Sequence, residues 1–189
     1  MKKIPTIFKR DPENRKLVTR EINPLCKWVF DGEGEAYQKL DGTACMINDK
    51  RLFKRRAVRK GRLVPLGFVE VDYDPNTETV FGWVPVYMHD AVNKYHIEAF
   101  NDLCGNFADG TYELVGPAIN GNPEKAVSHC LIPHNFIKFP NVPRDYDGLK
   151  CFLESNADME GLVFHHEDGR MAKIKHRDFD FQSTNTTGK

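Results

Sequence analysis

Gln38-Lys39-Leu40-Asp41-Gly42-Thr43 is the stretch from which the chain can best be interpreted. A lysine amine can attack a phosphorus atom and then carry the transferred group on its side-chain nitrogen. Free lysine has a pKa of about 10.4, so this use needs burial, neighbouring cations or a bound metal to favour the neutral amine. Gly42 is expected to provide a tight backbone turn beside a ligand. A lysine before an Asp-Gly turn is also typical of a solvated hairpin corner. The choice between a reactive lysine and a surface turn therefore depends on the rest of the sequence.

The segments on either side of this stretch have the pattern of short β-strands. We predict a strand leading into Lys39, a second strand at residues 43–47, a turn at 48–50 and a partner strand at 51–55. Lys39 is therefore expected where one strand ends and a hairpin begins. Residues 57–78 are polar and rich in turn-forming residues, and they predict a surface loop.

The remaining sequence predicts many short strands and two modest helices. A hairpin is expected at residues 4–22, helices at 93–104 and 147–154, and strands at 79–87, 111–115, 130–132, 161–166 and 170–175. This pattern predicts an α+β fold of antiparallel sheets flanked by helices. No P-loop or Gly-x-Gly-x-x-Gly motif is found. We expect one domain over residues 1–181 and a disordered polar tail over residues 182–189.

Composition indicates where such a protein would function. The chain has 189 residues, and none of its apolar runs approaches the roughly 18 residues that a membrane helix needs. Its N-terminus lacks the apolar core of a signal peptide. The five cysteines are widely spaced and include no Cys-x-x-Cys pair, which is typical of reduced thiols. These features predict a cytoplasmic protein without a membrane-spanning segment.

Charge is unevenly distributed along the chain, although the formal net charge is zero. Residues 50–62 are rich in lysine and arginine, whereas residues 70–78 are acidic. Two interpretations stay open. The basic segment could form a positive groove for nucleic acid, or the two segments could make a surface hairpin that screens its own charge. Zero net charge is mild evidence against a dedicated nucleic-acid binder.

Five segments, in chain order, resemble the sequence blocks of covalent lysine nucleotidyltransferases. Lys39-Leu40-Asp41-Gly42-Thr43 is similar to the nucleophile block, and Arg55 stands where those enzymes carry a nucleotide-binding arginine. Tyr112-Glu113-Leu114-Val115-Gly116 resembles the block whose glutamate holds the ribose. The metal-binding carboxylate block and the final Lys-x-Lys block are matched by Glu160-Gly161-Leu162-Val163 and Lys173-Ile174-Lys175. Each block alone is a weak signal, but their common order argues against chance.

Several segments resemble a narrower group, the vertebrate-type ATP-dependent 5′-to-3′ RNA ligase family with its phage and bacterial relatives. Besides the nucleophile block they are residues 82–86, 113–116, 120–123, 131–134 and 160–165, and the similarity extends from about residue 35 to 178. It implies a ligase adenylylation domain, and the length of the chain leaves no room for an OB domain. It also implies ATP as the nucleotide, Mg²⁺ or Mn²⁺ as the metal, and RNA with 5′-phosphate and 3′-hydroxyl ends as the substrate.

The resemblance implies a role for each lysine in a three-step reaction. Lys39 would attack the α-phosphate of ATP and form lysyl-AMP, AMP would pass to the RNA 5′-phosphate, and the 3′-hydroxyl would displace it. Lys173 and Lys175 lie two apart on a predicted strand, face the same side and would neutralise the α-phosphate. The vertebrate relatives do not clearly keep the lysine that matches Lys175, so its role is less firmly implied.

Polar residues would bind the metal and the ribose. Glu160 would hold the metal largely through waters, because Mg²⁺ dehydrates reluctantly. Glu113 would accept hydrogen bonds from ribose hydroxyls and assist the metal, although the bland alternative is an outward-facing strand residue. Arg55 would bind ribose or phosphate through its fork of donors. Asp41 would act in metal binding or in aligning the RNA ends.

The adenine is expected to be sandwiched by a ring from the segment after the Glu113 block. His134 is the first candidate and Phe136 the second, while the backbone beside Gln38 would read the adenine amino group. RNA would contact residues 50–62 and residues 175–177, mostly through phosphates and therefore in a salt-sensitive way. The histidine and cysteine spacings match no standard zinc pattern, and His165 has no assigned role.

Two other functions stay open. One is a DNA-nick ligase or a capping-type guanylyltransferase, against which the lack of room for an OB domain argues. The other is a non-catalytic module that binds a nucleotide or an RNA end. Intact Lys39, Glu113, Glu160 and Lys173 argue against that module, because a pure binder does not need a nucleophile.

Overall fold

The computed structural model describes residues 2–106 and 108–181, and their contacts divide into two compact units. Unit 1 comprises the described residues of Met1–Lys3 and Leu40–Phe136. Unit 2 comprises those of Ile4–Lys39 and Ile137–Lys189. The predicted tail at residues 182–189 lies outside the described residues, and one domain over residues 1–181 stays a prediction. In the described part of the chain, no helix is long and apolar enough to cross a membrane.

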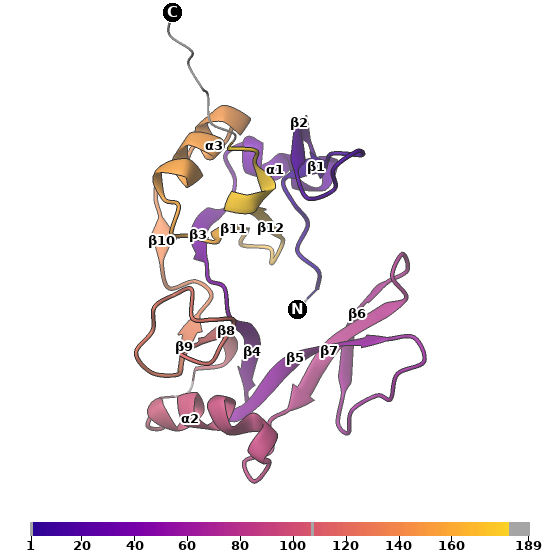
Figure 1. The fold of residues 1–189 in the computed structure, drawn as a ribbon, viewed down its shortest axis with the longest axis vertical. Coiled ribbons are helices and arrows are strands. Elements are labelled where there is room, and N and C mark those ends of the chain that lie inside the picture. The colour runs from indigo at the N-terminus through magenta and orange to yellow at the C-terminus, as the bar shows by residue number, and fades with distance from the viewer. Residues whose placement is uncertain (1, 107, 182–189) are drawn as a thin grey trace, which may run out of the picture. The chain divides into compact units, whose positions relative to one another are not determined.

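Unit 2 is built on a four-stranded antiparallel sheet in the order β10-β3-β11-β12 (Figure 1). Its strands are β3 (Glu35–Lys39), β10 (Lys138–Phe139), β11 (Gly161–His165) and β12 (Met171–Lys175). The hairpin of β1 (Phe8–Arg10) and β2 (Val18–Ile22), the helices α1 (Lys27–Phe30) and α3 (Tyr146–Ser155), and the 3-10 turns η1 (Pro24–Cys26) and η3 (His176–Asp178) complete the unit. Residues 5–7 extend the sheet, because Ile7 N–H donates to the Lys173 carbonyl at 3.0 Å.

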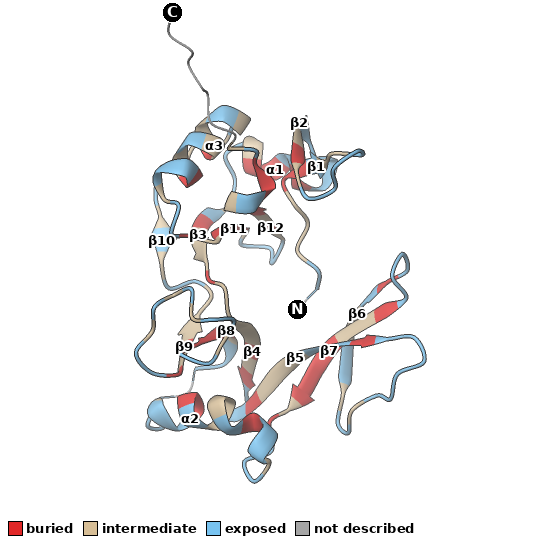
Figure 2. Cartoon of the chain, viewed as in Figure 1, coloured by how far each residue is buried: buried red, intermediate tan, exposed pale blue. Residues whose placement is uncertain are grey.

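One face of this sheet carries the core of unit 2. Ala36, Leu162, Phe164, Ala172 and Ile174 are buried there, together with side chains from α1, α3 and the N-terminal hairpin (Figure 2). Successive strand residues point to opposite faces. The residues between these apolar ones therefore project from the other face, and that face carries the lysines described below.

Unit 1 is built on a six-stranded antiparallel sheet in the order β6-β7-β5-β4-β8-β9. The strands are β4 (Thr43–Asn48), β5 (Arg51–Arg59), β6 (Val69–Asp74), β7 (Thr79–Pro85), β8 (Gly110–Val115) and β9 (Cys130–Pro133). The 3-10 turn η2 (Ala91–Asn93) leads into α2 (Lys94–Asp102). Ala99 and Phe100 of α2 pack with Cys45, Tyr112 and Leu114 of the sheet, which places the core of unit 1 on that face.

The structure confirms an α+β fold of antiparallel sheets with few helices. The predicted hairpins at residues 43–55 and 161–175 both form, and the strand predicted at residues 79–87 forms as β7, which ends at Pro85. The prediction of a surface loop over residues 57–78 was wrong, because β5 continues to Arg59 and β6 lies within this range. β6 is an edge strand whose residues are mostly exposed or half-buried, so it lacks the apolar alternation by which strands are recognised.

Candidate active site

Three neighbouring strands of unit 2 place Lys39, Gly161 and Lys175 in one row. Gly161 in β11 pairs with Lys39 in β3 on one side and with Lys175 in β12 on the other. Side chains in one row of a sheet point to the same face, so both lysines project from the face opposite the core. A Cβ atom at Gly161 would lie 2.1 Å from the carbonyl oxygen of Ile174. Glycine is therefore required in the middle of the row.

The carboxylate of Glu160 joins the two lysines. Lys39 Nζ donates to Glu160 Oε2 at 2.5 Å, and Lys175 Nζ donates to Glu160 Oε1. The three side chains are largely withdrawn from solvent, with 20%, 13% and 11% of Lys39, Lys175 and Glu160 exposed. Burial alone would raise the pKa of Glu160, but the charges and hydrogen bonds of the two lysines outweigh it and hold the pKa below its usual range. Glu160 is therefore an ionised counter-charge shared by two amines.

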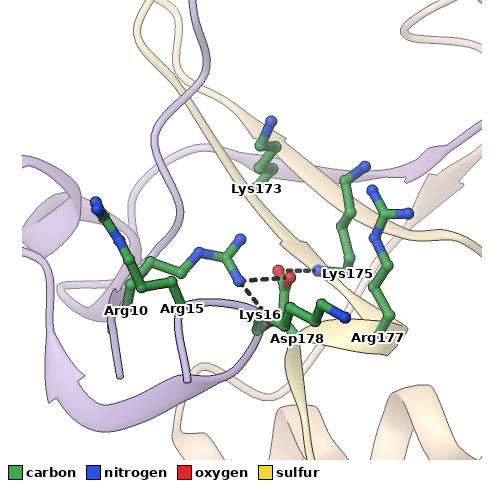
Figure 3. Close-up of a pocket in the computed structure, with 7 residues that line it drawn as sticks. All are labelled: Arg10, Arg15, Lys16, Lys173, Lys175, Arg177 and Asp178. Atoms are coloured by element: carbon green, nitrogen blue, oxygen red, sulfur yellow. Dashed lines mark hydrogen bonds and ion pairs between the residues drawn. The ribbon is translucent and has the colours of Figure 1, made fainter. Parts of the chain in front are cut away.

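Lys173 adds a third amine on the same face of the sheet. Its neighbours Ala172 and Ile174 are buried in the core, so Lys173 and Lys175 both face the other side, as predicted (Figure 3). Within the described residues, the Lys173 amine has no hydrogen bond or ion pair. Burial, followed by the charges of Lys175 and Lys39, lowers the pKa of Lys173 to about 8. This face of unit 2 thus concentrates three amines around one carboxylate.

In unit 1 the chain passes through Asp41 and Gly42 against strand β8. A Cβ atom at Gly42 would lie 2.2 Å from the carbonyl oxygen of Leu114 and 2.9 Å from Cγ of Glu113. The Gly42 N–H donates to Glu113 Oε1 at 3.1 Å. Gly42 does not have the left-handed backbone of a tight glycine turn. Glycine is required here because it allows close approach to a neighbouring strand, and the tight turn beside a ligand stays a prediction.

Glu113 is a buried carboxylate held by two donors. It points away from Tyr112 and Leu114, as strand alternation predicts, but only 8% of the residue is exposed, so the outward-facing alternative was wrong. His134 Nε2 lies 2.7 Å from Glu113 Oε2, and His134 Nδ1 lies 2.9 Å from Thr111 Oγ1. An ionised carboxylate only accepts hydrogen bonds, so Nε2 is the donor. His134 therefore orients Glu113.

Two residues that the sequence did not single out fix the Asp41–Gly42 segment. Asn120 Nδ2 donates to Asp41 Oδ1 at 3.1 Å and to the carbonyl oxygen of Gly42 at 2.8 Å. The Asp41 N–H donates to Glu124 Oε1 at 2.9 Å. Asn120 lies within the Asn-Gly-Asn-Pro segment on which part of the resemblance rests, and this was the only available signal. About 80 residues separate the partners in sequence, so no local pattern reveals the contact.

Arg55 lies in β5 on the face of the sheet that also carries Glu113. Cys45 pairs with Lys54 and with Tyr112, so the residues that follow Lys54 and Tyr112 both point to the opposite face. The guanidinium carbon of Arg55 lies 4.6 Å from the centre of the Phe81 ring. Burial lowers the pKa of Arg55, while the charges of Asp72 and Glu113 act in the opposite direction. Arg55 is thus a cation directed toward the Glu113 region of unit 1.

The three residues predicted to contact adenine differ from one another in burial and in hydrogen-bond partners. The Gln38 N–H donates to the Ile137 carbonyl at 2.8 Å, and Gln38 pairs with Leu162, so its side chain lies on the core-facing side of the sheet. Both ring nitrogens of His134 have partners, which leaves its ring faces for stacking. Phe136 is 72% exposed. The adenine contacts of all three stay predictions.

The donors suit a metal that is bound chiefly through substrate phosphates. Across residues 2–106 and 108–181, no three His, Cys, Asp or Glu side chains gather into a group that could hold a metal ion. Mg²⁺ usually takes one or two carboxylates together with phosphate oxygens and waters. Glu160 fits this mode, although a metal would have to compete with Lys39 and Lys175 for its oxygens. The Glu113 carboxylate would likewise have to share oxygens that now accept from Gly42 and His134.

Comparison with known proteins identifies the family. A family model described as RNA ligase 1 matches residues 90–185, just over half of the chain. RNA ligase 1 from Pongo abelii is 39% identical over 124 residues, which cover 49% of this chain and 38% of that protein. RNA ligase 1 from Danio rerio is 24% identical over 213 aligned residues, covering 82% of this chain and 65% of that protein. The chain thus spans from about a third to just under two thirds of these curated relatives. By the match to the family model, it belongs to the RNA ligase 1 family.

Proposed function

We propose that this chain is an ATP-dependent RNA ligase that joins 5′-phosphate and 3′-hydroxyl ends through a lysyl-AMP intermediate. The observation that carries the proposal is the Lys39–Glu160–Lys175 cluster, in which a half-buried lysine at a strand end faces further amines and one carboxylate. Membership of a family named for RNA ligase supports RNA as the substrate. We further propose that the two units together form a ligase adenylylation domain.

The first step is transfer of AMP to Lys39. Its Nζ attacks the α-phosphorus, an N–P bond forms, and the bond from that phosphorus to the bridging oxygen breaks as pyrophosphate leaves. The proton of the attacking amine passes to solvent. Lys173 and Lys175 stabilise the charge that accumulates on the α-phosphate oxygens. Mg²⁺ bound at Glu160 would supply further positive charge to the phosphates, and Lys39 must leave its ion pair with Glu160 before it attacks.

The two later steps use the same face. A 5′-phosphate oxygen of the RNA attacks the phosphorus of lysyl-AMP, the N–P bond breaks, and Lys39 regains its amine. The RNA 3′-hydroxyl then attacks the 5′-phosphorus, a phosphodiester forms, AMP leaves, and the hydroxyl proton passes to solvent. We propose that Asp41 acts in these steps by aligning the ends. Asn120 and Glu124 fix the backbone and side chain of Asp41 for that purpose.

Nucleoside recognition is assigned to unit 1. Glu113 is proposed to accept hydrogen bonds from the ribose hydroxyls. Its buried carboxylate is already oriented by two hydrogen bonds, one to each oxygen. Arg55 is proposed to bind ribose or phosphate. The His134 ring, held through both nitrogens, offers a fixed plane for the adenine.

The deciding experiment is covalent labelling with ATP that carries its label on the α-phosphate. Lys39→Arg keeps the positive charge opposite Glu160 but removes the amine that forms lysyl-AMP, so we expect it to abolish labelling. Lys138→Arg is the matched control, because Lys138 is an exposed strand lysine that is paired with Glu35. The protein is first treated with pyrophosphate to remove any AMP already attached. Equal labelling of the wild type and Lys39→Arg would refute the proposal.

Parallel reactions separate the alternatives. Labelling by GTP instead of ATP would indicate a guanylyltransferase. Sealing of a nicked DNA duplex in preference to 5′-phosphorylated RNA would indicate a DNA ligase. If no nucleotide labels the stripped protein although it binds ATP, the chain is a non-catalytic binding module.

A further inference from the structure

Unit 2 contains a cavity of about 650 Å³ lined almost entirely by basic side chains. Two parts of the sequence contribute to it. Arg10, Arg15 and Lys16 come from the N-terminal hairpin, and Lys173, Lys175 and Arg177 come from β12 and η3. Figure 3 shows Lys173, Lys175 and Arg177 projecting in a common direction. Asp178 is the only acidic lining residue among those described.

Most of this positive charge is not compensated within unit 2. Arg10 is neutralised, because its guanidinium donates to the buried Asp178 carboxylate at 2.8 Å and to the Lys16 carbonyl at 2.9 Å. Lys175 shares the Glu160 carboxylate with Lys39. In the part of the chain that the structure describes, the side chains of the other four cations make no hydrogen bond or ion pair: Arg15, Lys16, Lys173 and Arg177. Several cations without a partner around one cavity suit a ligand with several negative charges.

The lining favours a condensed phosphate over nucleic acid. A strand of RNA in such a cavity would be expected to find aromatic rings for its bases, because stacking is a main source of affinity for single strands. None of the described lining residues is aromatic or apolar. The guanidinium groups of Arg15 and Arg177 offer paired donors that match phosphate oxygens. A diphosphate places its charges close together and needs neither a base nor a sugar contact.

We infer that this basic cavity binds a pyrophosphate group. The two lysines proposed to hold the α-phosphate, Lys173 and Lys175, also line the cavity, so its ligand lies next to the site of transfer. Its occupant would be the β- and γ-phosphates of the nucleotide before the first step and free pyrophosphate afterwards. This identification of the occupant rests on the proposed function, whereas binding of inorganic pyrophosphate can be measured without any reaction.

The first test is calorimetric titration of inorganic pyrophosphate into protein stripped of AMP. We expect saturable binding that is weakened by about tenfold or more in the double variant Arg15→Gln/Lys16→Gln and in Arg177→Gln, because each change removes charge-assisted hydrogen bonds. Lys9→Gln is the matched control, since Lys9 lies in the same hairpin, is paired with Glu21 and does not line the cavity. The altered side chains are exposed, so folding should survive, and circular dichroism checks this.

Two results would overturn the assignment. One is the absence of pyrophosphate binding at millimolar concentration, or binding that the cavity variants leave unchanged. The other is binding of a 5′-phosphorylated RNA that depends on Arg15, Lys16 and Arg177 and that pyrophosphate does not displace. In that case the cavity is an RNA site.

A kinetic arm distinguishes this inference from the proposed function. The double variant Arg15→Gln/Lys16→Gln should lower the rate of labelling by ATP about tenfold but should leave the sealing of pre-adenylylated RNA unchanged, because pyrophosphate takes no part in that step. Equal loss in both reactions would contradict a pyrophosphate site. If no lysyl-AMP forms but pyrophosphate binds with the expected dependence, the ligase proposal falls while the cavity assignment stands.

Discussion

Replacement of Lys173 by methionine is expected to stabilise the protein at neutral pH. Lys173 is half-buried in β12 and faces the charges of Lys175 and Lys39. Its pKa is lowered from 10.5 to about 8, first by burial and then by these two lysines. Methionine keeps a similar length and removes the charge. The charged Lys173 amine therefore lowers the free energy of unfolding, and its proposed catalytic role accounts for its presence at this position.

The magnitude follows from the shift between 10.5 and about 8. One pKa unit corresponds to about 1.4 kcal/mol, so the charged amine costs the folded state up to about 3 kcal/mol. Below pH 8 the lysine is charged in both states and the full cost applies. Between pH 8 and 10.5 the unfolded chain keeps a proton that the folded protein has lost, so this contribution makes the wild type more stable as pH rises. Partial exposure screens the charge, and we expect a gain of about 2 kcal/mol for Lys173→Met at pH 7.

Urea denaturation of AMP-stripped wild type and Lys173→Met, at about pH 7 and again near pH 10, measures this difference. The variant should be more stable at pH 7, and its advantage should shrink at the higher pH. Lys138→Met provides the control, because the exposed pair with Glu35 should contribute less than about 1 kcal/mol. A variant less stable than wild type at pH 7, or an advantage that is the same at both pH values, would refute the reasoning.

Four further results are expected. Gly42→Ala should lower the free energy of unfolding by about 1–3 kcal/mol and abolish labelling by ATP, because its Cβ would overlap the Leu114 carbonyl. Glu113→Ala should destabilise by about 1–3 kcal/mol in urea, since it strips two half-buried donors of their acceptor, whereas Glu113→Gln should cost less than half of that. Asn120→Ala should slow sealing of pre-adenylylated RNA more than it slows labelling, as measured by single-turnover kinetics. Burial and a nearby lysine lower the pKa of His96 to about 4, so wild-type stability should fall between pH 6.5 and 4 more steeply than that of His96→Gln in urea titrations.

Local patterns were sufficient to predict two hairpins, one that follows Lys39 in the chain and one that carries Lys173 and Lys175. Residues 43–55 and 161–175 each combine a β-prone run, a polar turn that contains Asn or Asp, and a second run, so adjacent sequence was enough to pair the strands. The period of two along β12 also placed Lys173 and Lys175 on one face. By contrast, β10 is only two residues long and forms as an edge strand beside β3. Two residues are too few to show the alternation of apolar and polar side chains by which a strand is predicted.

The contacts that complete the site could not be predicted because they join distant parts of the chain. Lys39 and Glu160 are 121 residues apart, and Asp41 and Asn120 are 79 apart. The resemblance implied which residues to expect in a site but not which of them are in contact. His134 illustrates the difference, because a ring expected to stack on adenine also holds the carboxylate expected to bind ribose.

Gly42 and Gly161 show what the glycines of the two motifs contribute. Each stands beside a charged residue of the candidate site, and in sequence both resemble ordinary turn glycines. In the structure each is required because a Cβ atom would collide with the carbonyl oxygen of a neighbouring strand, Leu114 in one case and Ile174 in the other. In unit 2, the absent side chain of Gly161 lets β11 and β12 approach where Lys39, Glu160 and Lys175 emerge, and in unit 1 that of Gly42 lets the chain approach β8 beside Glu113. Each glycine thus fixes the spacing of the charged groups within its own unit, and a larger residue would displace the neighbouring strand and the charged side chains on it.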